Sequence, residues 1–232
     1  MQNTFSRPVY LLALAFLSLT CWTSCTKESA SSVNQDRIYT EYELFYDKNT
    51  DKTTAIARFK FGGATGTLLE LDSTSYVEFN GDRLPYNAIL GAHAKEYAGL
   101  KTDGTFSYRN LDEETFDNAV PTMARVAFPA ITTLPRSAAF TLSWVGGALT
   151  AGQEVGVFIN GINQADAQLF YQNALGATNI VLGTNQLGKL GIGEANCVMD
   201  LSTKKDVAKG TTVGGVIVSK YRAQNLKVQV TE

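Results

Sequence analysis

Two runs of alternating residues constrain the fold of this chain more than any other feature of its sequence. Residues 38–47 alternate between a set that includes Tyr42 and Leu44 and a more polar set that includes Glu41, and residues 54–61 repeat the pattern beyond a polar turn. A period of two places successive side chains on opposite faces of a β-strand. Two such runs around a polar turn predict a β-hairpin.

Short runs of this kind continue to the end of the chain, between turns rich in Gly, Asn and Asp. The 20 Gly and 5 Pro of the chain suit many short strands joined by tight turns. Pro129 and Pro135 stop strands on both sides of residues 130–134. They therefore mark an expected boundary between two domains, 37–129 and 136–232.

The second of these segments holds about seven short strands with a turn roughly every 8–12 residues, which is typical of an immunoglobulin-like β-sandwich. Residues 179–201 predict a strand, a helical turn with Leu187 and Leu190 inward, a glycine break and another strand. This segment resembles the late strands of immunoglobulin-like domains in secreted bacterial lipoproteins and adhesins. We therefore predict an all-β protein with two immunoglobulin-like β-sandwich domains in tandem.

The first residues of the chain form a sorting signal. Arg7 supplies a thin positive region, and the apolar run at residues 8–19 is far shorter than the roughly 20 residues that a membrane-spanning helix needs. We predict a signal peptide at residues 1–24 rather than a lasting transmembrane anchor.

The end of this segment, Thr23-Ser24-Cys25-Thr26-Lys27-Glu28, resembles the lipobox end of Bacteroidetes-type bacterial lipoprotein signals. The resemblance implies that Cys25 becomes the first mature residue and carries a lipid. Trp22 occupies a position where the family has an aliphatic residue, so Cys21 is the alternative. An ordinary cleaved signal peptide is also left open. Thr26 implies sorting to the outer membrane, facing either the periplasm or the cell surface.

Small polar residues follow the cysteine, so we expect residues 25–36 to form a flexible, lipid-anchored tether. The chain has a net charge of −2 and no basic cluster. Nucleic acid and acidic lipid head groups are therefore not expected to be bound through charge. The expected partners are the membrane, reached through the lipid, and an envelope protein or a glycan.

An acidic stretch at residues 110–118 is the one metal candidate. Its four carboxylates repel each other unless a cation lies among them, so a Ca²⁺ ion is one interpretation. A solvated acidic loop or a single helical turn is the simpler one. The candidate ligands are Asp112, Glu113, Glu114 and Asp117.

No catalytic motif or cofactor motif is found in the sequence. His93, the only histidine, has no Cys or Asp cluster around it and is expected at the surface. Cys197 is in phase with Ala195 and Met199 and is expected in the core, and it would have no disulfide partner if Cys25 carries the lipid. Trp144 is likewise expected in the core.

Aromatic residues of the first strand are candidates for ligand contact. Tyr39 and Phe45 lie on the face opposite Tyr42 and Tyr46, so one pair is either exposed or covered by a second sheet. We predict a non-enzymatic binding, adhesion or assembly module of the cell envelope. The alternatives are a surface enzyme or enzyme subunit that acts on polysaccharide through carboxylates from separate strands, and a passive spacer.

Overall fold

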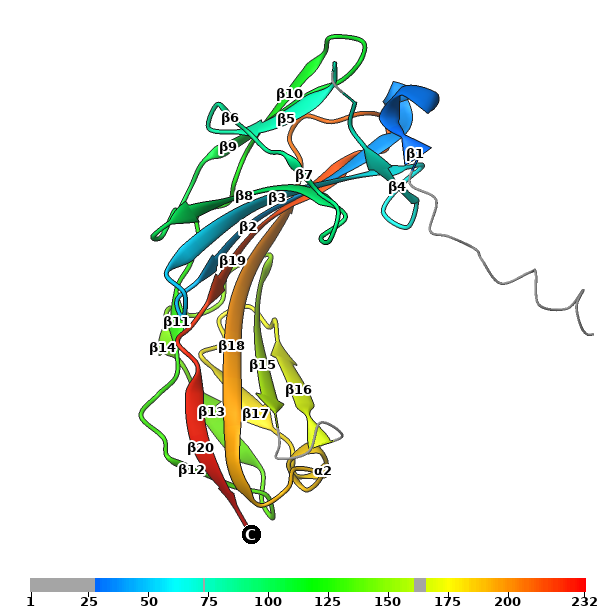
Figure 1. The fold of residues 1–232 in the computed structure, drawn as a ribbon. Helices are drawn as coiled ribbons and strands as arrows, with labels where there is room; N and C mark the ends of the chain where they lie inside the picture. Colours follow the sequence, from blue (N-terminus) through cyan, green and yellow to red (C-terminus); the bar gives the residue numbers. More distant parts are fainter. Residues whose placement is uncertain (1–27, 73, 161–165) are drawn as a thin grey trace, which may run out of the picture.

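The fold is all-β, as predicted (Figure 1). The computed structural model describes residues 28–72, 74–160 and 166–232. The strands before residue 129 are β1 (Glu28–Ser29), β2 (Ile38–Asp47), β3 (Lys52–Phe61), β4 (Thr67–Glu70), β5 (Tyr76–Phe79), β6 (Asp82–Arg83), β7 (Tyr86–Asn87), β8 (Ala92–Ala98), β9 (Thr105–Arg109), β10 (Thr115–Ala119) and β11 (Val126–Ala127).

The remaining elements are β12 (Thr133–Pro135), β13 (Phe140–Ser143), β14 (Val145–Gly146), β15 (Gln153–Asn160), β16 (Gln168–Gln172), β17 (Asn179–Leu182), the short helix α2 (Thr184–Leu187), β18 (Gly193–Asp206), β19 (Gly215–Arg222) and β20 (Leu226–Thr231). Two 3-10 turns, Ala30–Ser32 and Gln35–Arg37, precede β2. The predicted hairpin is confirmed, because β2 and β3 pair from Ile38 and Phe61 to Asp47 and Lys52.

One long sheet runs through the whole molecule. Within the described residues it has 12 strands, and its main path follows the order β1-β4-β3-β2-β19-β18-β15-β16. The late strand β19 lies parallel to β2, from the pair Gly215 and Thr40 to the pair Arg222 and Asp47. A strand from the end of the chain is thus hydrogen-bonded to one from its beginning.

The 14-residue strand β18 connects the two ends of this sheet. Its first residues pair with β20, residues 196–203 pair with β15, and residues 200–206 pair with β19. We call β1–β10 with β19 the N-terminal lobe and β12–β17 with β20 the C-terminal lobe. Figure 1 shows the two lobes joined at a bend, with β18 passing from one to the other.

Smaller sheets cover one side of the long sheet. The sheet β10-β9-β5-β6 packs on the N-terminal lobe, and the pair β13–β17 packs on the C-terminal lobe. The pair β11–β14 makes another small sheet. Each lobe is therefore layered like a sandwich, because a sheet must bury its apolar face against a second layer.

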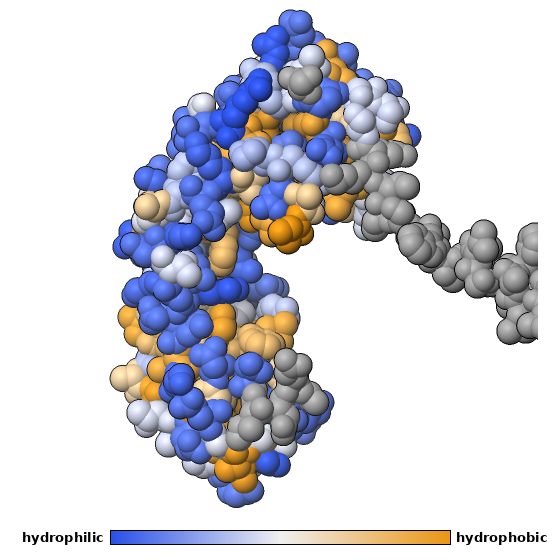
Figure 2. All heavy atoms as spheres, viewed as in Figure 1, coloured by the Kyte–Doolittle hydropathy of each residue, from blue (hydrophilic) through white to orange (hydrophobic). Residues whose placement is uncertain are grey.

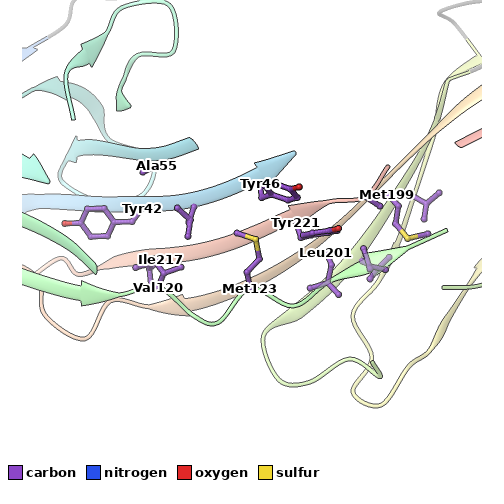
Figure 3. Packing of buried hydrophobic residues seen from close by; sticks show 14 of the residues in the cluster. Tyr42, Tyr46, Ala55, Val120, Met123, Met199, Leu201, Ile217 and Tyr221 are labelled. Atoms are coloured by element: carbon purple, nitrogen blue, oxygen red, sulfur yellow. The ribbon is translucent and has the colours of Figure 1, made fainter. Parts of the chain in front are cut away.

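The buried hydrophobic residues form one continuous cluster from Ala30 to Val230. In the N-terminal lobe its centre is aromatic, and the ring of Phe106 lies 4.9 Å from that of Tyr42. Figure 3 shows where the cluster passes the junction between the lobes, with residues of β2, β18 and β19 beside the segment that carries Met123. Among the residues that the structure describes, the cores of the two lobes belong to one cluster, with no polar layer between them.

The division into two folding units, 37–129 and 136–232, stays a prediction. Strand pairing crosses the expected boundary between them. Strand β2 of the first segment obtains one of its two neighbours from the second segment. The long sheet is therefore shared across the expected boundary. The tandem arrangement of immunoglobulin-like domains likewise stays a prediction.

The structure differs from the expected flexible tether over residues 28–36. Strand β1 pairs with β4, and Ala30 is fully buried. The Gln35 amide donates to the carbonyl oxygens of Ala30 and Val33, and its oxygen accepts from the Leu111 N–H. These contacts hold the segment against the N-terminal lobe. A buried amide makes hydrogen bonds in a folded protein, and these bonds fix its position.

Candidate functional site

One face of the long sheet is left open by the described part of the chain. Side chains of β2, β18 and β19 alternate between buried positions, which face the core, and half-buried positions, which face away from it. The half-buried face lies on the inner side of the bend in Figure 1. Figure 2 shows hydrophobic residues on both lobes where they border the hollow of the bend. We call this surface the inner face.

Two adjoining hollows lie on the inner face. The first has a volume of about 480 Å³ and is lined by Phe45 and Leu90 among others, and the second has a volume of about 670 Å³ and is lined by Phe158 and Tyr171 among others. The hollows share three lining residues, which are Glu43, Lys220 and Arg222. The two hollows therefore form a continuous surface across β2, β19, β18 and β15.

A network of ion pairs lies between the two hollows. The guanidinium of Arg222 donates from Nε to Asp200 Oδ1 at 2.8 Å and from Nη2 to Asp200 Oδ2 at 2.9 Å. The Lys220 ammonium lies 3.2 Å from the same Oδ2. These three residues come from the adjacent strands β18 and β19, where Asp200 is directly opposite Arg222. The bidentate geometry fixes the guanidinium plane.

This network keeps Asp200 ionised. Burial alone would raise the pKa of its carboxyl, but the hydrogen bonds from Arg222 and the charge of Lys220 outweigh burial and hold that pKa below its usual value. The pKa of the Arg222 guanidinium is raised, chiefly by its hydrogen bonds to Asp200. The centre of the inner face thus presents fixed charges of both signs.

The second hollow carries an aromatic platform. Tyr171 of β16 is 61% exposed, and its ring lies over Gly156, where a Cβ atom would meet ring carbons at 3.6 and 3.7 Å. Phe158 and Leu169 lie directly opposite each other on β15 and β16 and are 38% and 43% exposed. Apolar side chains exposed together in a hollow are typical of a binding surface.

Both aromatic candidates from the sequence lie on the inner face side of β2. Phe45 is half-buried in the first hollow, with the Lys220 ammonium 5.7 Å and the Arg222 guanidinium 5.1 Å from its ring centroid. Tyr39 is half-buried further along the same face. The second layer covers Tyr42 and Tyr46 instead. Tyr171 and Phe158 could not be recognised as site residues from the sequence, because neither of their short strands shows which strand it pairs with.

The acidic stretch forms the exposed turn of the hairpin between β9 and β10 and the first part of β10, not a helical turn. Its carboxylates have separate partners. Glu113 pairs with Arg109 at 3.0 Å, Glu114 accepts from the Asn110 amide at 2.8 Å, and Asp117 lies 3.9 Å from Lys209. Ser107 also donates to Asp117. Asp112 is exposed in the turn.

Within the part of the chain that the structure describes, no three His, Cys, Asp or Glu side chains lie close enough together to hold a metal ion. The carboxylates of the β9–β10 hairpin instead pair with neighbouring cations and amides. The calcium interpretation therefore gains no geometric support there.

Three carboxylates of the inner face line the second hollow: Glu43, Glu154 and Asp200. Hydrolysis of a glycosidic bond by paired carboxylates needs one of them to be protonated as a general acid. Asp200 does not suit that role, because Arg222 and Lys220 hold it ionised. A polysaccharide enzyme that used the second hollow would therefore need Glu43 or Glu154 as its general acid.

The structure corrects the expected surface position of His93, whose side chain is only 7% exposed. Its Nδ1 lies 3.1 Å from the Leu84 carbonyl oxygen, and its Nε2 accepts from the Leu71 N–H at 3.4 Å. The ring also packs edge-on against Phe59. These partners favour the neutral ring with its proton on Nδ1. Its flanking alanines carried no signal of this burial.

Stability is expected to fall as the pH drops from about 7 to about 5. Burial lowers the pKa of the His93 imidazole below 6.5, and the bond to Leu84 offsets only part of that effect. The unfolded chain therefore binds the proton first, and the free energy of unfolding decreases until the folded chain is protonated too. Urea titrations should show this decrease, and His93→Gln should remove it. The same decrease in the variant would contradict our assignment to His93.

The buried positions of Cys197 and Trp144 agree with the sequence analysis, since they are 2% and 6% exposed. The Trp144 indole N–H donates to the Gly147 carbonyl oxygen at 3.1 Å. Among the described residues Cys197 is a free cysteine, and burial raises the pKa of its thiol to about 12. Both residues therefore belong to the core.

Cys197 is expected to be unreactive in the folded protein, because a thiol must be accessible and ionised to attack a disulfide reagent. In the chain 26–232, Ellman's reagent at about pH 8 should titrate no thiol under native conditions and one thiol in guanidinium chloride. Rapid reaction of the native protein would contradict the buried position of the thiol.

The lipidation candidates Cys25 and Cys21, and the signal peptide at residues 1–24, lie outside the described residues. Over residues 28–72, 74–160 and 166–232, none of the helices is long and apolar enough to cross a membrane.

Comparison with known proteins does not identify a family for this chain. No family model and no curated protein sequence matches the chain. Seventeen solved chains match its structure. One of them comes from work described as "Structural insight into host cell surface retention of a 1.5-MDa bacterial ice-binding adhesin"; it is 12% identical, and the match covers 83% of this chain and 64% of that chain with a TM-score of 0.24. The chain thus spans less than two thirds of that structure, and so low a TM-score carries no conclusion about function.

Proposed function

We propose that this chain is a lipid-anchored binding module of the bacterial outer membrane, and that the inner face is its ligand surface. The observation that supports this most is the pair of adjoining hollows on a sheet face shared by both lobes. The anchor is proposed from Thr23-Ser24-Cys25 in the sequence. The body would then face the periplasm or the cell exterior.

The inner face has the chemistry of a recognition surface. Tyr171 and Phe158 offer apolar contact area with few rotatable bonds, and Arg222 and Asp200 offer hydrogen-bonding groups that their mutual ion pair already fixes in place. Fixed groups lose little conformational entropy on binding. An extended segment of an envelope protein or a glycan fits this combination. The hollows weigh against a passive spacer, which would need no such surface.

The anchor is tested by growing cells with a clickable fatty acid. Wild type and Cys21→Ala should be labelled, and Cys25→Ala should lose the label, because a lipoprotein carries its lipid on one cysteine. Label lost only in Cys21→Ala would move the cleavage site. Label retained in both variants would refute lipidation at either residue.

The ligand surface is tested with the soluble chain 26–232 on isolated cell envelopes and on a glycan array. Tyr171→Asp places a charge on the aromatic platform and should reduce binding at least about fivefold, since the central contacts of an interface cost more than about 1 kcal/mol when removed. Val181→Asp is the matched control, because Val181 is 57% exposed on the outer side of β17. Equal binding by both variants, or weaker binding by the control, would exclude the inner face.

A further inference from the structure

An apolar tip lies beside β4. Ile89 and Leu90 lie in the turn between β7 and β8 and are 96% and 44% exposed. Leu68 of β4 is 40% exposed, and a Cβ atom at Gly91 would meet its Cδ1 at 3.6 Å, so the turn contacts β4. We call Leu68, Ile89 and Leu90 the apolar tip.

The fold holds this tip in place. The Asn87 side-chain oxygen accepts the N–H groups of Ile89 at 3.0 Å and Leu90 at 3.1 Å. Gly91 then takes a φ of 56°, which a glycine adopts without strain. The hydrogen-bonded turn therefore holds Ile89 in its exposed position.

The tip is free of charge over a long stretch of sequence. Neither Lys, Arg, Asp nor Glu occurs between Arg83 and Lys95, or between Lys60 and Glu70. Entry into a lipid interface is costly for an ion and favourable for an aliphatic side chain. The composition of the tip therefore suits a bilayer better than a charged aqueous partner.

The tip also lies where the proposed anchor would hold the membrane. Glu28 of β1 is paired with Leu69, the neighbour of Leu68. Cys25 is three residues before Glu28, and three residues span at most about 10 Å. A lipid on Cys25 would thus keep the bilayer surface within about 10 Å of Glu28, which lies one strand spacing from the strand that carries Leu68.

We propose that the apolar tip is a second membrane contact, which inserts Ile89 into the lipid interface next to the acylated N-terminus, while Leu90 also lines the first hollow. This inference rests on the proposed lipidation of Cys25. A lipid at the chain end attaches the protein to the membrane but does not fix its orientation. A second contact fixes the orientation of the N-terminal lobe, and with it the direction in which the inner face opens.

The test places an environment-sensitive NBD label at Ile89→Cys in the lipidated mature protein, reconstituted into vesicles of phosphatidylethanolamine and phosphatidylglycerol. Cys197 is buried and stays unlabelled, and acylation blocks the Cys25 sulfur. The matched control is Val181→Cys, an exposed site in the C-terminal lobe. We expect a blue shift, quenching by a nitroxide lipid and protection from iodide at position 89, with none of these at position 181.

Flotation of the same vesicles separates the two proposals. Protein that floats with the vesicles while its position-89 label stays open to iodide would overturn the apolar tip as a membrane contact and leave the anchor standing. Protein that does not float would overturn the anchor and this inference together. A label that is exposed on vesicles but protected in native envelopes would identify a protein partner instead, and would equally overturn the proposal.

Discussion

Phe106→Ala in the soluble chain 26–232 is expected to lower the unfolding midpoint that Trp144 fluorescence reports, although Phe106 and Trp144 lie on opposite sides of the expected boundary at 129–136. Phe106 is fully buried, with its ring 4.9 Å from that of Tyr42 and 5.0 Å from that of Phe79. Truncation of a buried Phe costs about 3–5 kcal/mol. Such a loss is a large share of the roughly 5–15 kcal/mol that stabilises a domain.

Trp144 can report this loss only if the two segments unfold together. The chain has 2 Trp, and the other one, Trp22, lies before Cys25, so the soluble chain has a single tryptophan that can be excited selectively. The control is Phe158→Ala, which truncates the same side chain at a 38% exposed position on the inner face and should shift the midpoint far less. An unchanged Trp144 transition in Phe106→Ala, with a separate early transition by circular dichroism, would show that 37–129 and 136–232 are independent domains.

Ile217→Pro should abolish cooperative folding of the whole chain. Ile217 is 2% exposed at the centre of β19, which is hydrogen-bonded to β18 on one side and to β2 on the other. Proline removes a backbone N–H that the sheet needs, and within sheets it is found essentially only on edge strands or at bulges. The loss of the Ile217 side chain adds to this destabilisation.

Ile217→Val is the control for this variant, because it trims one methyl group and keeps the backbone donor. It should cost about 0.5–1.5 kcal/mol and retain a single transition in urea. If Ile217→Pro gave native circular dichroism and a Trp144 midpoint like that of Ile217→Val, the pairing of β19 with both β2 and β18 would not be needed for the fold.

The short-range features of the fold could be predicted from the sequence. The hairpin at 38–61 is confirmed because its alternation is regular and its turn is polar. The helical turn of α2 with Leu187 and Leu190 buried is also confirmed, since two leucines at helical spacing precede a glycine. In such segments neighbouring residues alone determine the local conformation.

The long-range pairing could not be predicted in this way. Strand β18 continues to Asp206, although its residues beyond Leu201 are mostly polar, because it has left the core of one lobe and entered the sheet of the other. Nothing in residues 215–222 identifies residues 40–47 as their partner. Alternation of polar and apolar residues predicts which face of a strand is buried, but it does not predict which strand lies beside that strand.

The candidate site was therefore predicted only in part. Phe45 could be found because its phase on β2 places it opposite the buried Tyr42. The other members of the inner face, such as Arg222 and Tyr171, reach Phe45 only through the pairing of β2 with β19 and of β18 with β15. A surface made by long-range pairing has no local sequence signal.

Site-specific photo-crosslinking in living cells tests whether the inner face binds the ligand of this protein. A photoreactive phenylalanine derivative at Tyr171 should give a discrete adduct with one envelope component, whereas the same residue at Val181, on the outer side of β17, should give none. The Asp200→Ala and Arg222→Ala variants should weaken the adduct at Tyr171, since they remove the fixed charges at the centre of the inner face. An adduct at Val181 with none at Tyr171 would show that the ligand does not bind to the inner face.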